Sequence, residues 1–220
     1  MKVINLSEQP SLLNSYLKEM RSVDVQKDSM RFRRNIERIG EIMAVEVSKQ
    51  FTYVAELVQT PLATASVEVY QDKVVLGTIL RAGLPLHQGF LNMFDAAENA
   101  FVSAYRKENE DEFGNVDLEI VSEYLAAPSL EGKTLILVDP MLATGMSMEI
   151  AYKALLTHGK PLSTHLVCVF ATPQALKYLE ENMPEETTLW CAVIDPELNE
   201  KKYIVPGLGD AGDLCFGTKL

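Results

Sequence analysis

The densest group of residues that could do chemistry lies at positions 135–147, LILVDPMLATGMS. An apolar run ends at Asp139, and a loop of small residues then leads directly into a segment with helical periodicity. Backbone N–H groups from Ala143 to Ser147 would converge with the unpaired amides of the helix's first turn, and the hydroxyls of Thr144 and Ser147 add donors. The pattern predicts an anion-binding loop, with an ordinary strand-to-helix turn as the alternative.

A second candidate segment, Gly207-Leu208-Gly209-Asp210-Ala211-Gly212, has the glycine spacing of a dinucleotide-binding loop. Only residues 213–220 follow it, which are too few for the helix, second strand and ribose-binding acid of such a unit. We therefore expect these glycines to have a different role. Beside Asp210 and Asp213, a backbone without side chains would let main-chain N–H and C=O groups approach a flat ligand closely.

The charge of the chain opposes the binding of anions at long range. The 220 residues include 20 basic and 31 acidic side chains, a net charge of −11, and nucleic-acid binding depends on basic residues that displace counterions from phosphates. Hydrogen bonds to a phosphate are worth about 1.5–3 kcal/mol each, whereas distant surface charges are screened beyond about 8 Å. We expect local donors to hold a small anion, and we expect no nucleic-acid partner.

The sequence also indicates where the protein works. No apolar run approaches the roughly 18 residues of a membrane-spanning helix, and the amino end, MKVINLSEQP, lacks the apolar block of a secretory signal. We therefore expect no membrane partner and a cytoplasmic location. Cys168, Cys191 and Cys215 are odd in number and far apart, which predicts buried thiols rather than disulfides or a metal site.

The elements that must position these residues alternate between strand and helix. Apolar, β-branched runs predict strands at 74–79, 134–138, 165–170 and 189–193. Helices are predicted at 146–158, which ends at Gly159 and Pro161, and from the Thr172-Pro173 cap to about Asn182. This alternation predicts an α/β protein with a doubly wound, mostly parallel sheet, and no linker divides residues 1–220 into more than one domain.

Three appendages are expected around this sheet. Residues 1–50 should form a helical lobe, in which a helix capped by Asp28 or Ser29 buries an apolar stripe and carries a face of arginines, either solvated or available to an effector phosphate or a subunit contact. Residues 106–132 predict a protruding β-hairpin with a turn at Phe113-Gly114-Asn115, acting as a flap, as a dimer arm or as a solvated excursion. Residues 195–220 form the carboxyl-terminal segment that holds the second glycine-rich loop.

Four separated motifs, in this order, resemble those of the uracil phosphoribosyltransferase family. They are Ile79 to Leu84 (ILRAGL), Tyr105-Arg106, Val138 to Ser147, and Tyr203 to Gly212 (YIVPGLGDAG). The resemblance covers essentially the whole chain. It implies a type I phosphoribosyltransferase fold that converts uracil and 5-phosphoribosyl 1-diphosphate (PRPP) to UMP and diphosphate in pyrimidine salvage, with Mg²⁺ carried by the diphosphate and with no protein-built metal site identified.

The resemblance also assigns roles to residues. It implies that PRPP is bound by Arg81, Arg106, Asp139, Pro140, Met141, Leu142, Ala143, Thr144, Gly145, Met146, Ser147 and Asp210. It implies that uracil is bound, largely through backbone atoms, by Ile204, Gly209, Asp210 and Ala211. The catalytic residues would be Asp139, Asp210 and Arg106. Met146 departs from the family pattern, which has glycine there, so either its side chain points away from the phosphate or the loop opens slightly.

Several alternatives stay open at this point. The protein could transfer the same group to another nucleobase, or it could be a non-catalytic, pyrimidine-sensing regulator. Asp210 is a candidate for the group that takes the proton of uracil, and an equal candidate for one that orients the donor. The family resemblance further suggests GTP as an activator and a homo-oligomer, either a dimer or a tetramer.

Overall fold

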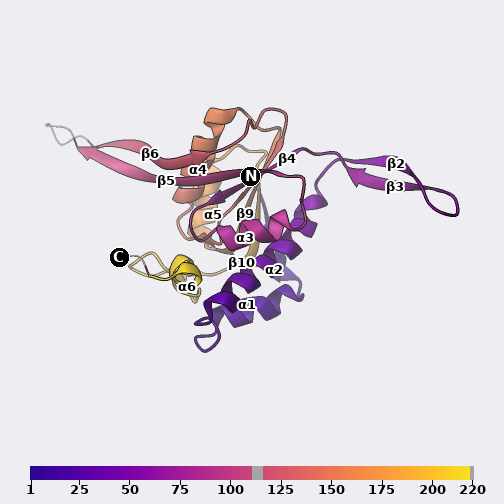
Figure 1. The fold of residues 1–220 in the computed structure, drawn as a ribbon. Coiled ribbons are helices and arrows are strands. Elements are labelled where there is room, and N and C mark those ends of the chain that lie inside the picture. Colours follow the sequence, from indigo (N-terminus) through magenta and orange to yellow (C-terminus); the bar gives the residue numbers. More distant parts are fainter. Residues whose placement is uncertain (111–115, 219–220) are drawn as a thin grey trace.

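The computed structural model describes residues 1–110 and 116–218, and within 104–110 and 116–123 it describes the backbone alone. The turn predicted at Phe113-Gly114-Asn115 lies outside the described residues. Figure 1 shows a central sheet with helices on both sides and two long hairpins that project in opposite directions, β2–β3 and β5–β6.

The helices and strands follow one another along the chain as the sequence predicts in its central part. The strands are β1 (Lys2–Asn5), β2 (Tyr53–Gln59), β3 (Thr64–Tyr70), β4 (Val74–Ile79), β5 (Glu98–Glu110), β6 (Val116–Ala126), β7 (Thr134–Val138), β8 (Met141–Leu142), β9 (Ser163–Ala171), β10 (Thr188–Ile194), β11 (Glu197–Leu198) and β12 (Ile204–Val205). The α-helices are α1 (Leu13–Arg21), α2 (Ser29–Ser48), α3 (Leu84–Leu91), α4 (Met146–Leu155), α5 (Pro173–Asn182) and α6 (Ala211–Phe216), with short 3₁₀ turns at Leu6–Glu8 and Leu156–His158.

The central sheet has the strand order β1-β10-β9-β7-β4-β5-β6, and β8 pairs with β9. Every pairing is parallel except that of β5 with β6. β4 and β7 are buried at every position, as expected for uninterrupted apolar strands covered on both faces. The predicted doubly wound, mostly parallel sheet is confirmed.

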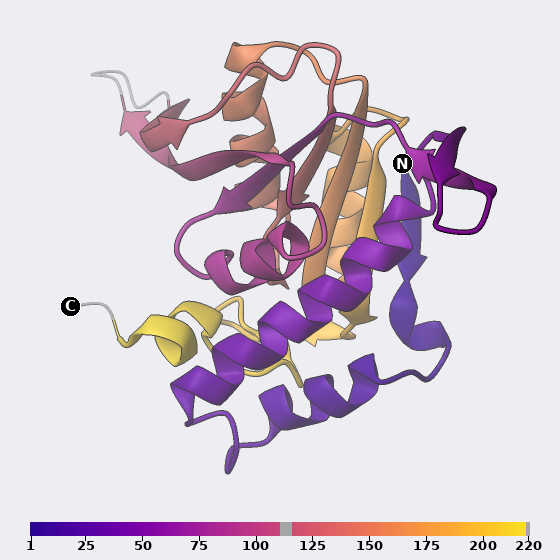
Figure 2. The ribbon, with the colours of Figure 1, turned by 45° about the vertical axis from the view of Figure 1, so that its right-hand side comes forward.

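Side chains of successive residues in these strands enter two separate cores. Leu76, Ile136 and Val138 pack with the buried faces of α1, α2 and α3. Val75 and Leu135, one residue out of phase, pack with α4 and α5 on the other side of the sheet. Helix α3 follows β4 and packs in the first of these cores, whereas helix α4 follows the adjacent strand β7 and packs in the second. The connections after the two strands therefore lead to opposite faces of the sheet (Figure 2). Among the described residues, no helix combines the length and apolar character that a membrane crossing needs.

Helix α2 forms as its sequence predicts. The side chain of Asp28 caps it by accepting a hydrogen bond from the backbone N–H of Arg31 at 3.0 Å. The apolar stripe is buried at Phe32, Ile36, Ile39 and Met43, which have the predicted 4-3-4 spacing. On the polar face, Arg31 pairs with Glu19, and Arg33 donates to the carbonyl oxygen of Cys215. The arginine face is therefore used in part for contacts within the chain.

The structure differs from the sequence predictions in its appendages. β1, within the region 1–50 expected to be helical, pairs with β10 at the edge of the sheet. The β5–β6 hairpin is longer than the predicted 106–132 span on its amino side, because β5 begins at Glu98 as a parallel neighbour of β4 before it pairs with β6. The β2–β3 hairpin was not predicted at all, and every residue of β2 is exposed. The three cysteines are buried and free, as predicted.

Candidate active site

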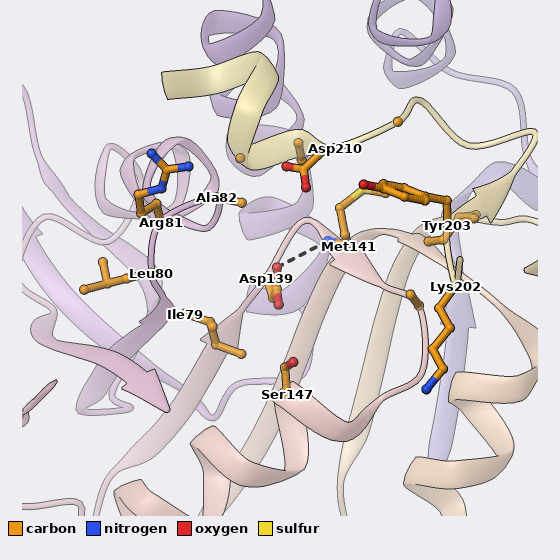
Figure 3. Close-up of a pocket in the computed structure, with 15 residues that line it drawn as sticks. Ile79, Leu80, Arg81, Ala82, Asp139, Met141, Ser147, Lys202, Tyr203 and Asp210 are labelled. Carbon is orange, nitrogen blue, oxygen red and sulfur yellow. Dashed lines mark hydrogen bonds between the residues drawn. The ribbon is translucent and has the colours of Figure 1, made fainter. Parts of the chain in front are cut away.

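A pocket of about 340 Å³ opens at the carboxyl edge of the sheet, where β4 and β7 end (Figure 3). Thr78 pairs with Val138, so the segments that follow the two strands leave the sheet side by side. Because the helices after these strands lie on opposite faces, this is the crevice in which open α/β sheets bind ligands. Its lining comes from three segments: Ile79, Leu80, Arg81 and Ala82; Asp139, Met141, Ala143 and Ser147; and Lys202, Tyr203, Ile204, Gly209, Asp210, Ala211 and Gly212.

Asp139 lies at the centre of this pocket, directly after β7 (Figure 3). Its backbone N–H donates to the carbonyl oxygen of Val167, and its side-chain Oδ1 accepts from the N–H of Met141 at 3.3 Å. Burial raises the pKa of the Asp139 carboxyl from 3.8 to about 7, and the Met141 hydrogen bond offsets part of this rise. Near neutral pH, this carboxyl can therefore change its charge when a ligand binds beside it.

The loop after Asp139 is tightly anchored to the neighbouring strand and helix. The carbonyl oxygen of Pro140 accepts hydrogen bonds from Val169 and Phe170, and Thr172 Oγ1 donates to the carbonyl oxygen of Ala143 at 2.7 Å. Gly145 precedes α4 with a φ of 84°, a left-handed conformation that favours glycine. The loop is thus held in one shape, with the amino terminus of α4 at its end.

The predicted phosphate-loop residues separate into three groups by position. Asp139, Met141, Ala143 and Ser147 line the main pocket. The same four residues, together with Leu142, Thr144, Gly145 and Met148, line a smaller adjoining cavity of about 60 Å³. Pro140 and Met146 line neither cavity.

The carboxyl-terminal segment closes the pocket on its other side. Ile204, Gly209, Asp210 and Ala211, the four residues assigned to uracil, all line it. Asp210 caps the short helix α6, since its Oδ1 accepts from the N–H of Asp213 at 2.9 Å. Gly209 has a φ of 96° and open space where a side chain would begin, so the backbone is exposed to a ligand there.

Six pocket residues have no role assigned from the sequence: Ile79, Leu80, Ala82, Lys202, Tyr203 and Gly212. Lys202 has a φ of 60°, and with Tyr203 it forms the wall next to β12 (Figure 3). Tyr203 begins the YIVPGLGDAG motif, so its place in the sequence was a signal. Lys202 stands just before the motif, and only the folded chain brings it to the pocket.

Of the two arginines assigned to the diphosphate, the structure places one. Arg81 lies at the pocket's edge, 3.7 Å from Asp213 Oδ1, and donates to the carbonyl oxygen of Gly217 at 3.4 Å. Its Nε is buried and has no hydrogen-bond partner within the described part of the chain. The backbone of Arg106 lies in β5 opposite Ile120, and its side chain is outside the described residues.

These features together define a type I phosphoribosyltransferase. They are a doubly wound sheet, an acidic residue and an anion-binding loop after one strand, an arginine after the neighbouring strand, and a glycine-rich wall opposite. The family model of uracil phosphoribosyltransferase matches residues 7–218. The chain belongs to the uracil phosphoribosyltransferase family.

Individual relatives agree with this assignment. The uracil phosphoribosyltransferase of Porphyromonas gingivalis is 56% identical over 220 residues, which is 100% of both chains. That of Pyrobaculum arsenaticum is 40% identical over 197 residues, 89% of this chain and 91% of the relative. The solved structure of the AQ2163 protein from Aquifex aeolicus superposes with a TM-score of 0.80 at 29% identity, covering 99% of each chain.

Proposed function

We propose that the protein transfers the phosphoribosyl group of PRPP to uracil in the pocket described above, giving UMP and diphosphate in pyrimidine salvage. The observation that carries this proposal is the convergence of three separate family motifs on one pocket. Arg81 comes from the ILRAGL motif, Asp139 and Ser147 from the motif at Val138 to Ser147, and Asp210 from the YIVPGLGDAG motif. The family assignment makes the protein an enzyme of this class.

The 5′-phosphate of PRPP fits best at the loop that opens α4. Ser147 lines both the main pocket and the smaller cavity, whereas Thr144 and Gly145 line the smaller one. The free N–H groups of the helix's first turn favour an anion, and the helix dipole adds about 0.3–1 kcal/mol. With the phosphate at this loop, the ribose hydroxyls would lie near Asp139.

Uracil would occupy the other end of the pocket, against Ile204, Gly209 and Ala211. The exposed backbone at Gly209 can offer donors and acceptors to the edge of a flat base, which gives recognition without long side chains. Tyr203 adds an aromatic wall on this side. We expect this segment to determine which base is accepted.

The reaction needs positioning and charge neutralisation more than a nucleophile. Displacement at the anomeric carbon develops positive charge on the sugar and negative charge on the departing diphosphate. Arg81 and Arg106 would bind the leaving group, and the carboxylates of Asp139 and Asp210 would lie near the sugar. Asp210 can serve either to take the proton of uracil or to orient the donor, and both roles stay open.

Magnesium fits this site as an ion that enters bound to the substrate. Asp139 and Asp210 are the acidic residues in the pocket lining, and nowhere in 1–110 or 116–218 do three or more His, Cys, Asp or Glu residues form a group able to hold a metal. Mg²⁺ commonly binds one or two carboxylates together with substrate phosphates. Such a donor set suits an ion held mainly by the diphosphate, where it would neutralise the leaving group.

The remaining expectations concern the protein's setting. We propose that the enzyme is cytoplasmic, forms a homo-oligomer, and responds to GTP as some relatives do. These proposals depend on the family resemblance. Gel filtration coupled to light scattering tests the oligomer, and the rate of UMP formation with and without GTP tests the activation.

The central proposal is tested by incubating the purified protein with Mg²⁺, PRPP and, in turn, uracil, adenine, hypoxanthine and guanine. We expect UMP and diphosphate with uracil and little product with the purines. Preferred use of a purine would show a phosphoribosyltransferase for another base. Release of no diphosphate with any base would overturn the enzymatic proposal and favour the pyrimidine-sensing regulator.

A further inference from the structure

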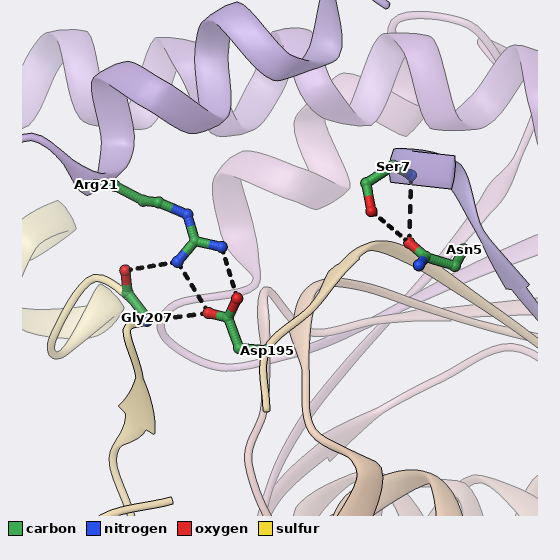
Figure 4. Close-up of polar contacts among 5 residues, drawn as sticks. All are labelled: Asn5, Ser7, Arg21, Asp195 and Gly207. Carbon is green, nitrogen blue, oxygen red and sulfur yellow. Dashed lines mark hydrogen bonds and ion pairs between the residues drawn. The ribbon is translucent and has the colours of Figure 1, made fainter. Parts of the chain in front are cut away.

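A cluster of polar contacts joins the end of α1 to the carboxyl-terminal segment, residues 195–220, and its members do not line the pocket (Figure 4). Arg21, the last residue of α1, binds Asp195 with two hydrogen bonds, from NH2 to Oδ1 at 2.7 Å and from NH1 to Oδ2 at 2.9 Å. NH1 of Arg21 also donates to the carbonyl oxygen of Gly207 at 3.0 Å. The N–H of Gly207 donates in turn to Asp195 Oδ2 at 2.9 Å. Both polar groups of Gly207 are therefore fixed by one ion pair.

Gly207 lies at the centre of the tight turn that carries the uracil-binding residues. Its φ is 50°, and a side chain there would begin 2.1 Å from the carbonyl oxygen of Ile204. Ile204 lines the pocket just before this turn, and Gly209 lines it just after. A shift of the Gly207 backbone must therefore move pocket-lining residues on both sides of it.

The ion pair is built to hold its position. The side chain of Asp195 is only 5% exposed and that of Arg21 26%, and the guanidinium carbon lies 4.7 Å from the centre of the Phe170 ring. A bidentate pair between a guanidinium and a carboxylate fixes both distance and orientation, and the aromatic face adds a cation–π contact. A carboxylate this deeply buried becomes costly when its partner is removed.

Two further contacts join the amino-terminal lobe to the same segment. The side-chain amide nitrogen of Gln26, in the orientation that satisfies it, donates to the carbonyl oxygens of Met20 and Leu208 at 2.9 and 3.0 Å. Arg33 NH1 donates to the carbonyl oxygen of Cys215 at 2.6 Å. The lobe thus contacts the carbonyl oxygens of Gly207, Leu208 and Cys215 in the carboxyl-terminal segment. Of these contacts, the one made by the Arg21–Asp195 pair is at the turn itself.

We propose that Arg21 and Asp195 are positioning residues for uracil: they set the place of the turn at Gly207 and thereby the affinity for the nucleobase. This inference rests on the proposed function for its kinetic test. The turn lies between Ile204 and Gly209, which are assigned to uracil, whereas the 5′-phosphate of the donor is assigned to the separate loop at 144–147. Substitution of Arg21 or Asp195 should therefore affect the base much more than the phosphoribosyl donor. The amino-terminal lobe then acts as part of the base-recognition machinery.

The kinetic test compares Asp195→Asn and Arg21→Lys with the wild-type enzyme. For Asp195→Asn we expect the KM for uracil to rise about tenfold, which corresponds to the loss of one strong hydrogen bond, while the KM for PRPP changes less than about twofold. Arg21→Lys keeps the charge but loses the bidentate geometry, so it should fall between wild type and Asp195→Asn. Equal increases in both KM values, or an unchanged KM for uracil in both folded variants, would overturn the proposal.

Arg31→Lys provides the matched control. Arg31 makes a comparable two-hydrogen-bond pair with Glu19 in the same lobe, from Nε at 2.9 Å and from NH2 at 2.8 Å. None of the hydrogen bonds that the structure gives this pair involves Gly207. The Arg31→Lys control should therefore keep the wild-type KM for uracil. If Arg31→Lys raises that KM as much as Arg21→Lys, general loosening of the lobe explains the effect and the proposal is wrong.

A second measurement does not depend on the reaction. Amide hydrogen exchange in the ligand-free protein should become faster at residues 204–211 in Asp195→Asn and stay unchanged there in Arg31→Lys. Unchanged exchange at these residues in Asp195→Asn would overturn the positioning role even if the wild-type enzyme makes UMP. Faster exchange in a wild-type background that makes no UMP would instead support the positioning role and contradict the proposed function.

Discussion

At the scale of single residues, Asp139 joins the chemistry of the pocket to the stability of the fold. Burial raises its pKa from 3.8 to about 7, so the folded protein keeps a proton that the unfolded chain loses between these values. This residue therefore makes the free energy of unfolding decrease as the pH rises from about 4 to 7. A pKa difference of this size corresponds to a change of at most about 4 kcal/mol in the free energy of unfolding, and access of water to the pocket makes that change smaller.

The variant Asp139→Asn removes this titration. The free energy of unfolding of Asp139→Asn minus that of wild type, measured by urea unfolding, should increase by about 1–2 kcal/mol from pH 4 to pH 8. The rate of UMP formation should fall roughly tenfold or more. Asp24→Asn, which removes an exposed carboxylate from the amino-terminal lobe, is the control. A difference between Asp139→Asn and wild type that stays constant with pH would contradict the assigned pKa.

Arg106 requires a functional test because the structure describes only its backbone. If its guanidinium binds the leaving diphosphate, Arg106→Ala should raise the KM for PRPP by about tenfold or more and change the affinity for uracil little. Steady-state kinetics with each substrate varied in turn measure this difference. Similar losses for both substrates would indicate a structural role for Arg106. Lys107→Ala, one position along β5, serves as the control for loss of a positive charge.

The site residues differ in how far the sequence could predict them. Asp139 and Ser147 belong to one contiguous strand-loop-helix segment, so local pattern was enough to select them. Lys202 belongs to the pocket only because β12 and the turn after it bring residues 202–212 across from β7, a tertiary arrangement with no local signal. Arg21 lies 174 positions from Asp195, a separation at which local sequence pattern carries no signal of the pairing.

At the scale of elements, the predictable parts are those whose burial is uniform. β4 and β7 are apolar and buried throughout, and α5 carries its cap at Thr172 where the sequence places it. The β2–β3 hairpin escaped prediction because it has no buried face to produce a regular pattern: Leu57 is 79% exposed and Leu62 97%. β1 has only four residues, and its strand character depends on pairing with β10.

The phosphate loop gives a prediction at this scale. Gly145 has a φ of 84°, and a side chain there would begin 3.0 Å from Cδ1 of Tyr178 and 3.1 Å from the carbonyl oxygen of Ala175. Gly145→Ala should therefore press the loop away from α5, lower the free energy of unfolding by about 2–3 kcal/mol, and raise the KM for PRPP. Urea unfolding and initial rates measure the two effects.

Gly132 separates the two causes of that effect. Its φ is 73°, yet nothing lies within 4 Å of an added Cβ, so Gly132→Ala introduces the backbone strain without the contact. We expect a loss of about 1 kcal/mol and an unchanged KM for PRPP. If the two variants lose equal stability and keep equal KM values, the packing of the loop against α5 has no part in PRPP binding.

At the scale of the whole molecule, the half-buried Asp139 and the buried His165 lie at opposite ends of the parallel strands and make opposite contributions to the pH dependence of stability. Asp139 follows the carboxyl end of β7, whereas His165 lies near the amino end of β9, 6% exposed. Burial lowers the pKa of His165 from 6.5 to about 4, and Asp72 opposes the change. The indole N–H of Trp190 donates to its Nδ1 at 3.2 Å, which selects a neutral imidazole.

The signs of these two contributions predict how stability depends on pH. Between pH 4 and 6.5, His165 is protonated in the unfolded chain and neutral in the folded protein. His165 alone therefore lowers the free energy of unfolding by roughly 2 kcal/mol from pH 7 to pH 5. Asp139 acts in the opposite direction over the same interval, so the free energy of unfolding of the wild-type protein should decrease by less than His165 alone predicts. His165→Gln, which keeps an acceptor for the indole, should become more stable on acidification, and Asp139→Asn less stable. Fluorescence of Trp190, the single tryptophan, follows unfolding in each variant. Parallel pH profiles for the two variants would contradict the opposed titration of the two ends of the sheet.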